Sequence, residues 1–261
     1  MKIREIVAPL EEFAPLALQE HYDNAGLIVG DPDDEADAAL VCVDVTEAVL
    51  EEAVERGAGL VIAHHPLVFH PLKRLSRTTY IERAVRRAVR EGIAVYACHT
   101  NLDSAPQGMS YALGRQLGLQ EMELLTPSGA AAGAGFGVVG RPECEMPTEA
   151  FLRMVRERLG TGAIRHSALV RETVRRVALC TGAGASMMAD ARRSGADLYI
   201  SADFRYNDFL DADNDLVIAD VGHFESEYCA IGLICEIIRK KITNFALHRS
   251  ERSVNPVNYL V

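Results

Sequence analysis

The hydrophobic residues of this chain follow two spacings, one typical of helical faces and one of buried strands. Near the N-terminus, Ile3, Ile6 and Leu10 share the spacing of one helical face, which predicts an amphipathic opening helix. After residues 23–26, short apolar runs alternate with longer helical patterns. The runs cover 40–45, 60–63 and 93–97, and the helical patterns lie around 46–56 and 78–90. This alternation predicts an α/β fold with mostly parallel sheets.

The regular pattern stops between residues 126 and 140, where glycine and alanine dominate. Such a segment suits neither a helix nor a central strand, so we expect a long loop or a domain boundary there. A second α/β region follows it. Its pattern predicts helices at 148–159 and about 225–241, extended runs at 163–170 and 174–180, and strands at 197–200, 216–219 and 245–248.

Composition and charge exclude several classes of protein. The chain of 261 residues is 49% hydrophobic and 25% charged, as in ordinary globular proteins. Its formal net charge of −10 is spread along the sequence, which argues against binding to a nucleic-acid backbone. The N-terminus lacks the pattern of a secretory signal, and no apolar stretch is long enough to span a membrane. The six cysteines contain no Cys-x-x-Cys pair and are interpreted as reduced, buried thiols of a cytoplasmic protein.

Candidate metal ligands gather where the predicted strands end. His64 and His65 directly follow the run 60–63, and His99 follows the run that begins at residue 93. In open α/β sheets, sites form beyond the carboxyl ends of the strands. These histidines are therefore expected to face one pocket.

The spacing of these residues indicates two ions rather than one. Adjacent strand residues point to opposite faces, so His64 and His65 are badly placed to bind a single ion unless the chain turns at Pro66. With two ions, each histidine can serve its own metal. His223 and Glu227 are four residues apart at a helix start and can reach the same centre. A set of imidazoles and carboxylates without cysteine suits Zn²⁺, Mn²⁺, Fe²⁺, Ni²⁺ or a similar ion in an open catalytic site.

Each histidine also has an ordinary structural interpretation. A single histidine at a strand end is more often a hydrogen-bonded structural residue than a ligand. The combination of an adjacent pair before proline, a His-x3-Asp at 99–103 and a His-x3-Glu at 223–227 favours a metal site.

At these positions the chain resembles the Nif-three-like dinuclear-metal family, whose members are often described as type-2 homologues of GTP cyclohydrolase I. The matching segments span most of the chain in the right order: Asp23-Asn24-Ala25-Gly26-Leu27-Ile28-Val29-Gly30, Ala63-His64-His65-Pro66-Leu67, His99-Thr100-Asn101-Leu102-Asp103 and Asp220-Val221-Gly222-His223-Phe224-Glu225-Ser226-Glu227. The resemblance implies five ligands. His65 and Asp103 would bind one ion, His64 and His223 the other, and Glu227 would bridge both.

The resemblance also implies an architecture. Two interlinked α/β domains are expected: residues 1–125 with about 219–261 form the first, which carries the ligands, and about 126–218 form the second. A toroidal homohexamer with its metal sites facing an inner cavity is expected as well.

Two functions remain open for such a site. Paired divalent ions activate water, so a hydrolase acting on a nucleotide-like or other small substrate is the first hypothesis. A GTP cyclohydrolase, a phosphatase or an amidohydrolase would use the same ligands. His99 would then act as a proton shuttle or, equally well, orient Asp103. The second hypothesis is a non-enzymatic metal-binding protein that stores, delivers or senses metal or serves as an interaction platform.

Two further features carry less weight. The segment 181–186 follows a strand and precedes a helix, so its backbone N–H groups could bind an anion, although a tight turn is the more common explanation. Arg83, Arg86, Arg87 and Arg90 recur on one predicted helix, which indicates a solvated face.

Overall fold

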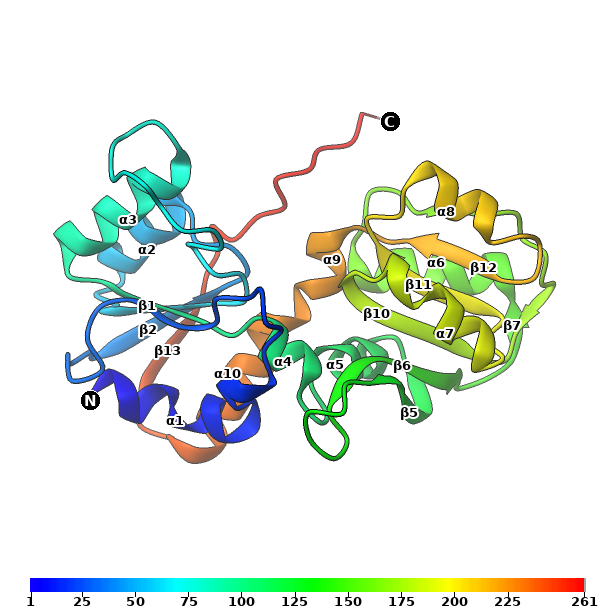
Figure 1. Ribbon diagram of the computed structural model, residues 1–261, viewed down its shortest axis with the longest axis horizontal. Coiled ribbons are helices and arrows are strands. Elements are labelled where there is room, and N and C mark those ends of the chain that lie inside the picture. Colours follow the sequence, from blue (N-terminus) through cyan, green and yellow to red (C-terminus); the bar gives the residue numbers. More distant parts are fainter. Residues whose placement is uncertain (261) are drawn as a thin grey trace. The chain divides into compact units, whose positions relative to one another are not determined.

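The expected alternation of strands and helices is present in the structure, a computed structural model that describes residues 1–260 (Figure 1). The chain divides into two units. The first consists of Met1–Ala105 and Ala230–Val254. The second consists of Pro106–Cys229 and residues 255–260. The chain thus leaves the first unit, completes most of the second and then returns to the first.

The first unit is built on a five-stranded sheet in the order β1-β4-β3-β2-β13. Its strands are β1 (Gly26–Val29), β2 (Ala38–Cys42), β3 (Leu60–Ala63), β4 (Ala94–Ala97) and β13 (Ala246–Arg249). β1 pairs with β4 in the antiparallel sense, whereas β4, β3, β2 and β13 run parallel. The carboxyl ends of β2, β3 and β4 therefore lie at one edge of the sheet.

Helices cover both faces of this sheet. They are α1 (Ile3–Phe13), α2 (Glu47–Glu55), α3 (Tyr80–Glu91), α4 (Thr100–Ser104) and α10 (Cys229–Lys241), with a short 3-10 turn at Leu16–Leu18. α2 and α3 lie on one face, and α1 and α10 lie on the other (Figure 1). Leu40, Val61 and Val95 pack against α2 and α3 in one hydrophobic cluster, as the alternation of side chains along buried strands requires.

The second unit contains a mixed six-stranded sheet in the order β5-β6-β10-β11-β12-β8. Its strands are β5 (Leu119–Pro127), β6 (Gly135–Pro142), β8 (Arg165–His166), β10 (Val177–Ala183), β11 (Leu198–Ala202) and β12 (Val217–Asp220). β10, β11 and β12 are parallel, and the flanking strands are antiparallel. A separate pair joins β7 (Met146–Pro147) to β9 (Thr173–Val174).

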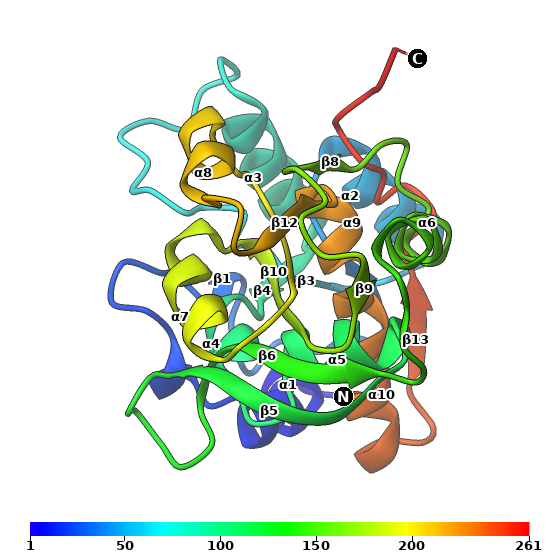
Figure 2. The same cartoon turned by 90° about the vertical axis from the view of Figure 1, so that its right-hand side faces the viewer.

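The helices of the second unit also lie on both faces of its sheet. They are α5 (Met109–Gln116), α6 (Thr148–Leu159), α7 (Met188–Arg193), α8 (Tyr206–Asp211) and α9 (His223–Glu227), with a 3-10 turn at Ala185–Met187. Leu179 and Ile200 pack in one cluster with Phe151 of α6, while Ala178 and Tyr199 pack in another with Met188 of α7. Figure 2 shows α7 and α8 on one side of the sheet and α6 on the other.

Most predicted elements are confirmed, and two predictions are corrected. The expected loop at 126–140 is shorter, because β6 begins at Gly135 and pairs with β5 on one side and β10 on the other. Glycine suits this strand: a Cβ on Gly137 would lie 3.0 Å from the Leu179 carbonyl oxygen. The expected helix at 225–241 is two helices, α9 and α10, separated at Tyr228.

The divisions between the units lie at 105/106 and 229/230, whereas the sequence placed them near 125 and 219. β5 pairs along β6, and β12 pairs with β11, so both strands and their connections pack within the second unit. His223 and Glu227 consequently belong to the second unit, while His64, His65 and Asp103 belong to the first.

Among the helices of residues 1–260, none combines the length and the apolar character that crossing a membrane requires.

Candidate metal centre

The histidine pair of the first unit lies just beyond β3. His64 is completely buried, and its Nδ1 donates to the Cys98 carbonyl oxygen at 2.8 Å. His65 is partly exposed, and its Nδ1 donates to Asp44 Oδ1 at 2.8 Å. The two ring centroids are 4.9 Å apart. Because a carbonyl or a carboxylate only accepts, both rings carry hydrogen on Nδ1, and in the neutral form Nε2 is the nitrogen able to bind a metal.

Asp103 approaches the same histidine pair from α4. Its Oδ1 lies 4.0 Å from His64 Nε2. Two ligands that bind one ion at about 2.0–2.1 Å each lie no more than about 4.2 Å apart. The spacing is therefore short enough for both atoms to bind one ion, or for each to bind one of two neighbouring ions. The backbone also orders this turn, because the Asp103 N–H donates to the His99 carbonyl oxygen at 3.1 Å.

His99 is held by the carboxylate of Asp23, a residue for which the sequence predicted no role. Its Nδ1 donates to Asp23 Oδ1 at 2.7 Å, and Asp23 Oδ2 accepts from the Thr100 N–H at 3.0 Å and from the Thr100 hydroxyl. Burial acts to raise the pKa of Asp23, but the hydrogen bonds from His99 and Thr100 outweigh it and bring the pKa to about 2. The His99 ring lies 5.5 Å from the His64 and His65 rings, centroid to centroid.

The second unit contributes His223 and Glu227 from α9, which follows β12. His223 Nε2 lies 3.0 Å from Glu227 Oε2, as their four-residue spacing on a helix predicts. His223 Nδ1 donates to Asp203 Oδ2 at 2.7 Å. The Glu227 side chain is almost fully buried, whereas that of His223 is partly exposed.

The glycine turn after β10 packs against this helix. The Gly182 N–H donates to Ser226 Oγ at 2.9 Å, so this amide is used within the protein rather than for an anion. Gly182 has a φ of +61°, and a Cβ there would lie 2.1 Å from Glu227 Oε1 and 3.3 Å from His223 Cε1. Only glycine fits this position, which agrees with the interpretation of 181–186 as a tight turn.

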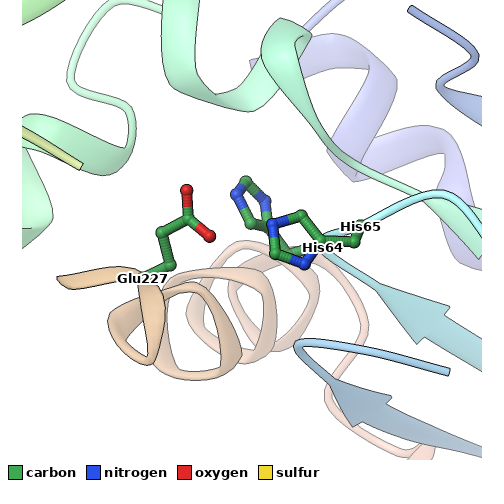
Figure 3. A group of neighbouring side chains, drawn as sticks. All are labelled: His64, His65 and Glu227. Carbon is green, nitrogen blue, oxygen red and sulfur yellow. The ribbon is translucent and has the colours of Figure 1, made fainter. Parts of the chain in front are cut away.

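Three of the predicted ligands form a group that could hold a metal ion. One ligand atom each from His64, His65 and Glu227 lies within 4.8 Å of the other two (Figure 3). Glu227 stands three residues before Ala230, where the chain returns to the first unit. The group contains imidazole and carboxylate donors only, which suits a divalent ion.

Comparison with known proteins identifies the family. A family model described as Duf34/NIF3 (NGG1p interacting factor 3) matches residues 1–256. This chain belongs to the Duf34/NIF3 family. The match covers every segment on which the resemblance rested, from residue 23 to residue 227.

Individual members of the family are similar over nearly their whole length. A "GTP cyclohydrolase 1 type 2 homolog" of Clostridium perfringens is 32% identical over 243 residues, which cover 93% of this chain and 93% of that protein. A protein of the same name from Lactococcus lactis is 32% identical, with 98% of each covered. A crystal structure of a Staphylococcus aureus hypothetical protein superposes with a TM-score of 0.91 at 25% identity, covering 100% of this chain and 99% of that one.

Two cysteines of this Duf34/NIF3 protein, Cys42 and Cys98, have thiols that burial keeps in the protonated form. Cys42 and Cys98 lie near the candidate site in the sequence, and both are fully buried. Burial raises the pKa of each thiol well above its ordinary value, so both stay protonated. A protonated thiol is a poor metal ligand.

Sequence reasoning did not find Asp44 and Asp203, the partners of His65 and His223. Asp44 follows β2 and Asp203 follows β11. The rule that sites form beyond the carboxyl ends of strands could have indicated both carboxylates.

Proposed function

We propose that this protein is a metal-dependent hydrolase whose two divalent ions are bound by His64, His65, Asp103, His223 and Glu227. The main observation behind the proposal is that the three imidazoles are held in the same way. In each ring, Nδ1 donates a hydrogen bond to an oxygen of the protein. Metal-binding histidines typically donate their second ring nitrogen in this way. The close approach of His64, His65 and Glu227 supports the same assignment.

Divalent ions in such a site polarise a scissile bond and lower the pKa of water to near neutrality. The chain's own residues would hold those ions and orient the substrate beside them. In the assignment taken from the family resemblance, His65 and Asp103 would hold one ion, His64 and His223 would hold the other, and Glu227 would contribute to both. The ion can be Zn²⁺, Mn²⁺, Fe²⁺, Ni²⁺ or a similar metal, because this donor set suits each of them.

His99 is the residue we propose for proton transfer. Its ring lies beside His64 and His65 and is oriented by Asp23. The alternative, in which His99 orients Asp103, is supported only through its backbone oxygen, since Nδ1 is on Asp23. An imidazole whose Nδ1–H is on a carboxylate presents Nε2 as the atom that exchanges a proton.

The proposed substrate is a nucleotide-like or other small molecule. The relatives named GTP cyclohydrolase 1 type 2 homolog make GTP the first compound to test. A homohexamer is the proposed assembly, following the family resemblance.

The test is turnover by metal-loaded protein on a panel of nucleotides, phosphoesters and amides. We expect His65→Ala to abolish turnover of any substrate found while the oligomeric state is unchanged. His166→Ala is the matched control: within residues 1–260 the His166 side chain hydrogen-bonds only to the neighbouring Ser167 carbonyl oxygen, so the substitution should leave turnover intact. If fully metal-loaded protein turned over none of these compounds, the result would favour a non-enzymatic metal-binding protein instead.

The ligand assignment has its own test in the metal content of purified protein. Asp103→Ala and Glu227→Ala should each lower the metal-to-protein ratio, because each removes a charged donor. Asp211→Ala, a change at an exposed position, should leave the ratio unchanged. Full occupancy in both ligand variants would refute the assignment.

A further inference from the structure

Two carboxylates outside the proposed ligand set each hold one of its imidazoles. In the first unit, Asp44 Oδ1 accepts from His65 Nδ1 at 2.8 Å. In the second unit, Asp203 Oδ2 accepts from His223 Nδ1 at 2.7 Å. Each pair lies wholly within one unit.

The two pairs are built in the same way. Asp44 follows β2 and His65 follows β3, and these strands are parallel neighbours. Asp203 follows β11 and His223 follows β12, which are also parallel neighbours. In both units, one strand end therefore supplies a histidine and the adjacent strand end supplies its carboxylate.

The carboxylate determines which nitrogen of the ring can bind a metal. An ionised carboxylate only accepts, so the ring hydrogen lies on Nδ1 and the lone pair of the neutral ring lies on Nε2. The hydrogen bond also fixes the direction of the ring. A negative partner further increases the basicity of the ligating nitrogen.

We propose that Asp44 and Asp203 are positioning residues that orient His65 and His223 and strengthen the binding of the ion held by each. The inference rests on the proposed function, since it requires both histidines to be ligands. His64 provides the contrast, because its Nδ1 donates to the uncharged carbonyl of Cys98. Two of the three imidazoles are thus supported by a negative charge, one in each unit.

The backbone at Asp203 determines which substitutions test this role cleanly. Asp203 has a φ of +58°, a left-handed conformation that aspartate, asparagine and glycine tolerate better than other residues. Asp203→Gly therefore removes the acceptor without backbone strain. Asp213 is its matched control: it is exposed, has a φ of +46° and forms no side-chain hydrogen bond or ion pair within residues 1–260.

The experiment measures Zn²⁺ affinity of metal-depleted protein by competition with a chelator. Asp44→Ala and Asp203→Gly should each weaken Zn²⁺ binding about 10- to 100-fold. Asp44→Ala should affect the ion bound by His65, and Asp203→Gly should affect the ion bound by His223. Each variant should therefore bind one of its two zinc ions more weakly and the other as wild type does. Asp213→Gly, and Asp37→Ala at an exposed position of the first unit, should bind Zn²⁺ as wild type does.

A second measurement does not depend on the metal. Nitrogen-15 spectra of the histidine rings in metal-depleted wild type should show hydrogen on Nδ1 of His65 and His223. Asp44→Ala should remove this preference at His65 alone, and Asp203→Gly at His223 alone. Asp44→Asn retains an oxygen acceptor, so it should keep the ring state and recover part of the lost affinity.

The outcomes separate this inference from the proposed function. Wild-type affinity in both carboxylate variants, or hydrogen on Nε2 in the wild-type rings, would overturn the positioning role while the metal site stands. A wild-type protein that binds no Zn²⁺ or other divalent ion would overturn the proposed function and this inference together.

Discussion

At the scale of single residues, the candidate centre depends on hydrogen bonds that fix its donors. In His64, His65 and His223, Nδ1 donates a hydrogen bond to a different acceptor in each case, and in His99 it donates to Asp23. Four rings are thus held in one tautomer before any ligand binds. Preorganisation of this kind lowers the entropic cost of binding a metal ion or a substrate.

The lack of a side chain at Gly182 leaves space for the Glu227 carboxylate. Gly182→Ala should lower metal occupancy, because the added Cβ would lie 2.1 Å from Glu227 Oε1 and must displace that carboxylate. It should also reduce the free energy of unfolding by about 1–3 kcal/mol. Metal analysis and chemical denaturation measure both effects.

Gly57→Ala is the control for backbone strain alone. Gly57 has a φ of +64°, close to that of Gly182, and a Cβ there meets nothing within 4 Å. This variant should lose only about 1 kcal/mol and keep its metal. Equal metal loss in both variants would contradict the role given to Gly182.

At the scale of elements, a buried carboxylate ties α2 to the segment that follows β13. The Glu52 side chain is 3% exposed and accepts from Ser250 Oγ and from the backbone N–H groups of Glu251 and Arg252. Arg56 on the next turn of the helix also pairs with it at 2.8 Å. Burial acts to raise the pKa of Glu52, but these partners outweigh it and lower the pKa below the ordinary value.

The lowered pKa of Glu52 makes the free energy of unfolding decrease as the pH falls. Because the folded pKa lies below the unfolded one, the ionised group stabilises the fold fully above the unfolded pKa, about 4.3. That contribution is lost as the pH falls through the folded pKa. Glu52→Gln should therefore lower the free energy of unfolding by about 1–3 kcal/mol at neutral pH, with the difference from wild type shrinking below about pH 4.

Urea denaturation across this pH range measures the effect. Glu55→Gln is the control, since Glu55 pairs with Arg252 at an exposed surface. Exposed ion pairs contribute only about 0–1 kcal/mol. A Glu52→Gln difference that persists unchanged at low pH would contradict the assignment.

At the scale of the whole molecule, the first unit is discontinuous in sequence. β13 pairs with β2, and α10 supplies the buried residues Ile231, Ile234 and Ile238. The first unit therefore needs residues that the chain supplies only after the second unit. Most of the second unit, by contrast, is one continuous segment from residue 106 to residue 229.

This organisation predicts different behaviour of two fragments. Residues 106–229 expressed alone should unfold cooperatively in urea, because all of the six-stranded sheet lies within them. Residues 1–105 alone should not, since they lack β13 and α10. Joining residues 1–105 to 230–254 through a flexible linker should restore a cooperative transition. Circular dichroism during urea denaturation shows whether each fragment unfolds cooperatively. Cooperative unfolding of residues 1–105 alone would refute the prediction.

The α/β class and the positions of the candidate ligands at strand ends could be predicted from local sequence patterns. Short apolar runs form buried parallel strands. A histidine directly after such a run lies at the strand end, as His64 and His65 do. The four-residue spacing of His223 and Glu227 likewise follows from local helix geometry. These features depend on neighbours along the chain, so they can be predicted without the fold.

The hydrogen-bond acceptor of each imidazole ring and the division between the two units depend on contacts between residues remote in sequence. The Asp203–His223 and Asp23–His99 pairs join residues 20 and 76 positions apart, distances at which local patterns say nothing about contact. The glycine-rich strand β6 is stabilised by β5 and β10 on its two sides rather than by its own composition. Strand pairing depends on partners remote in sequence, and for this reason the loop expected at 126–140 became a strand from Gly135 onward.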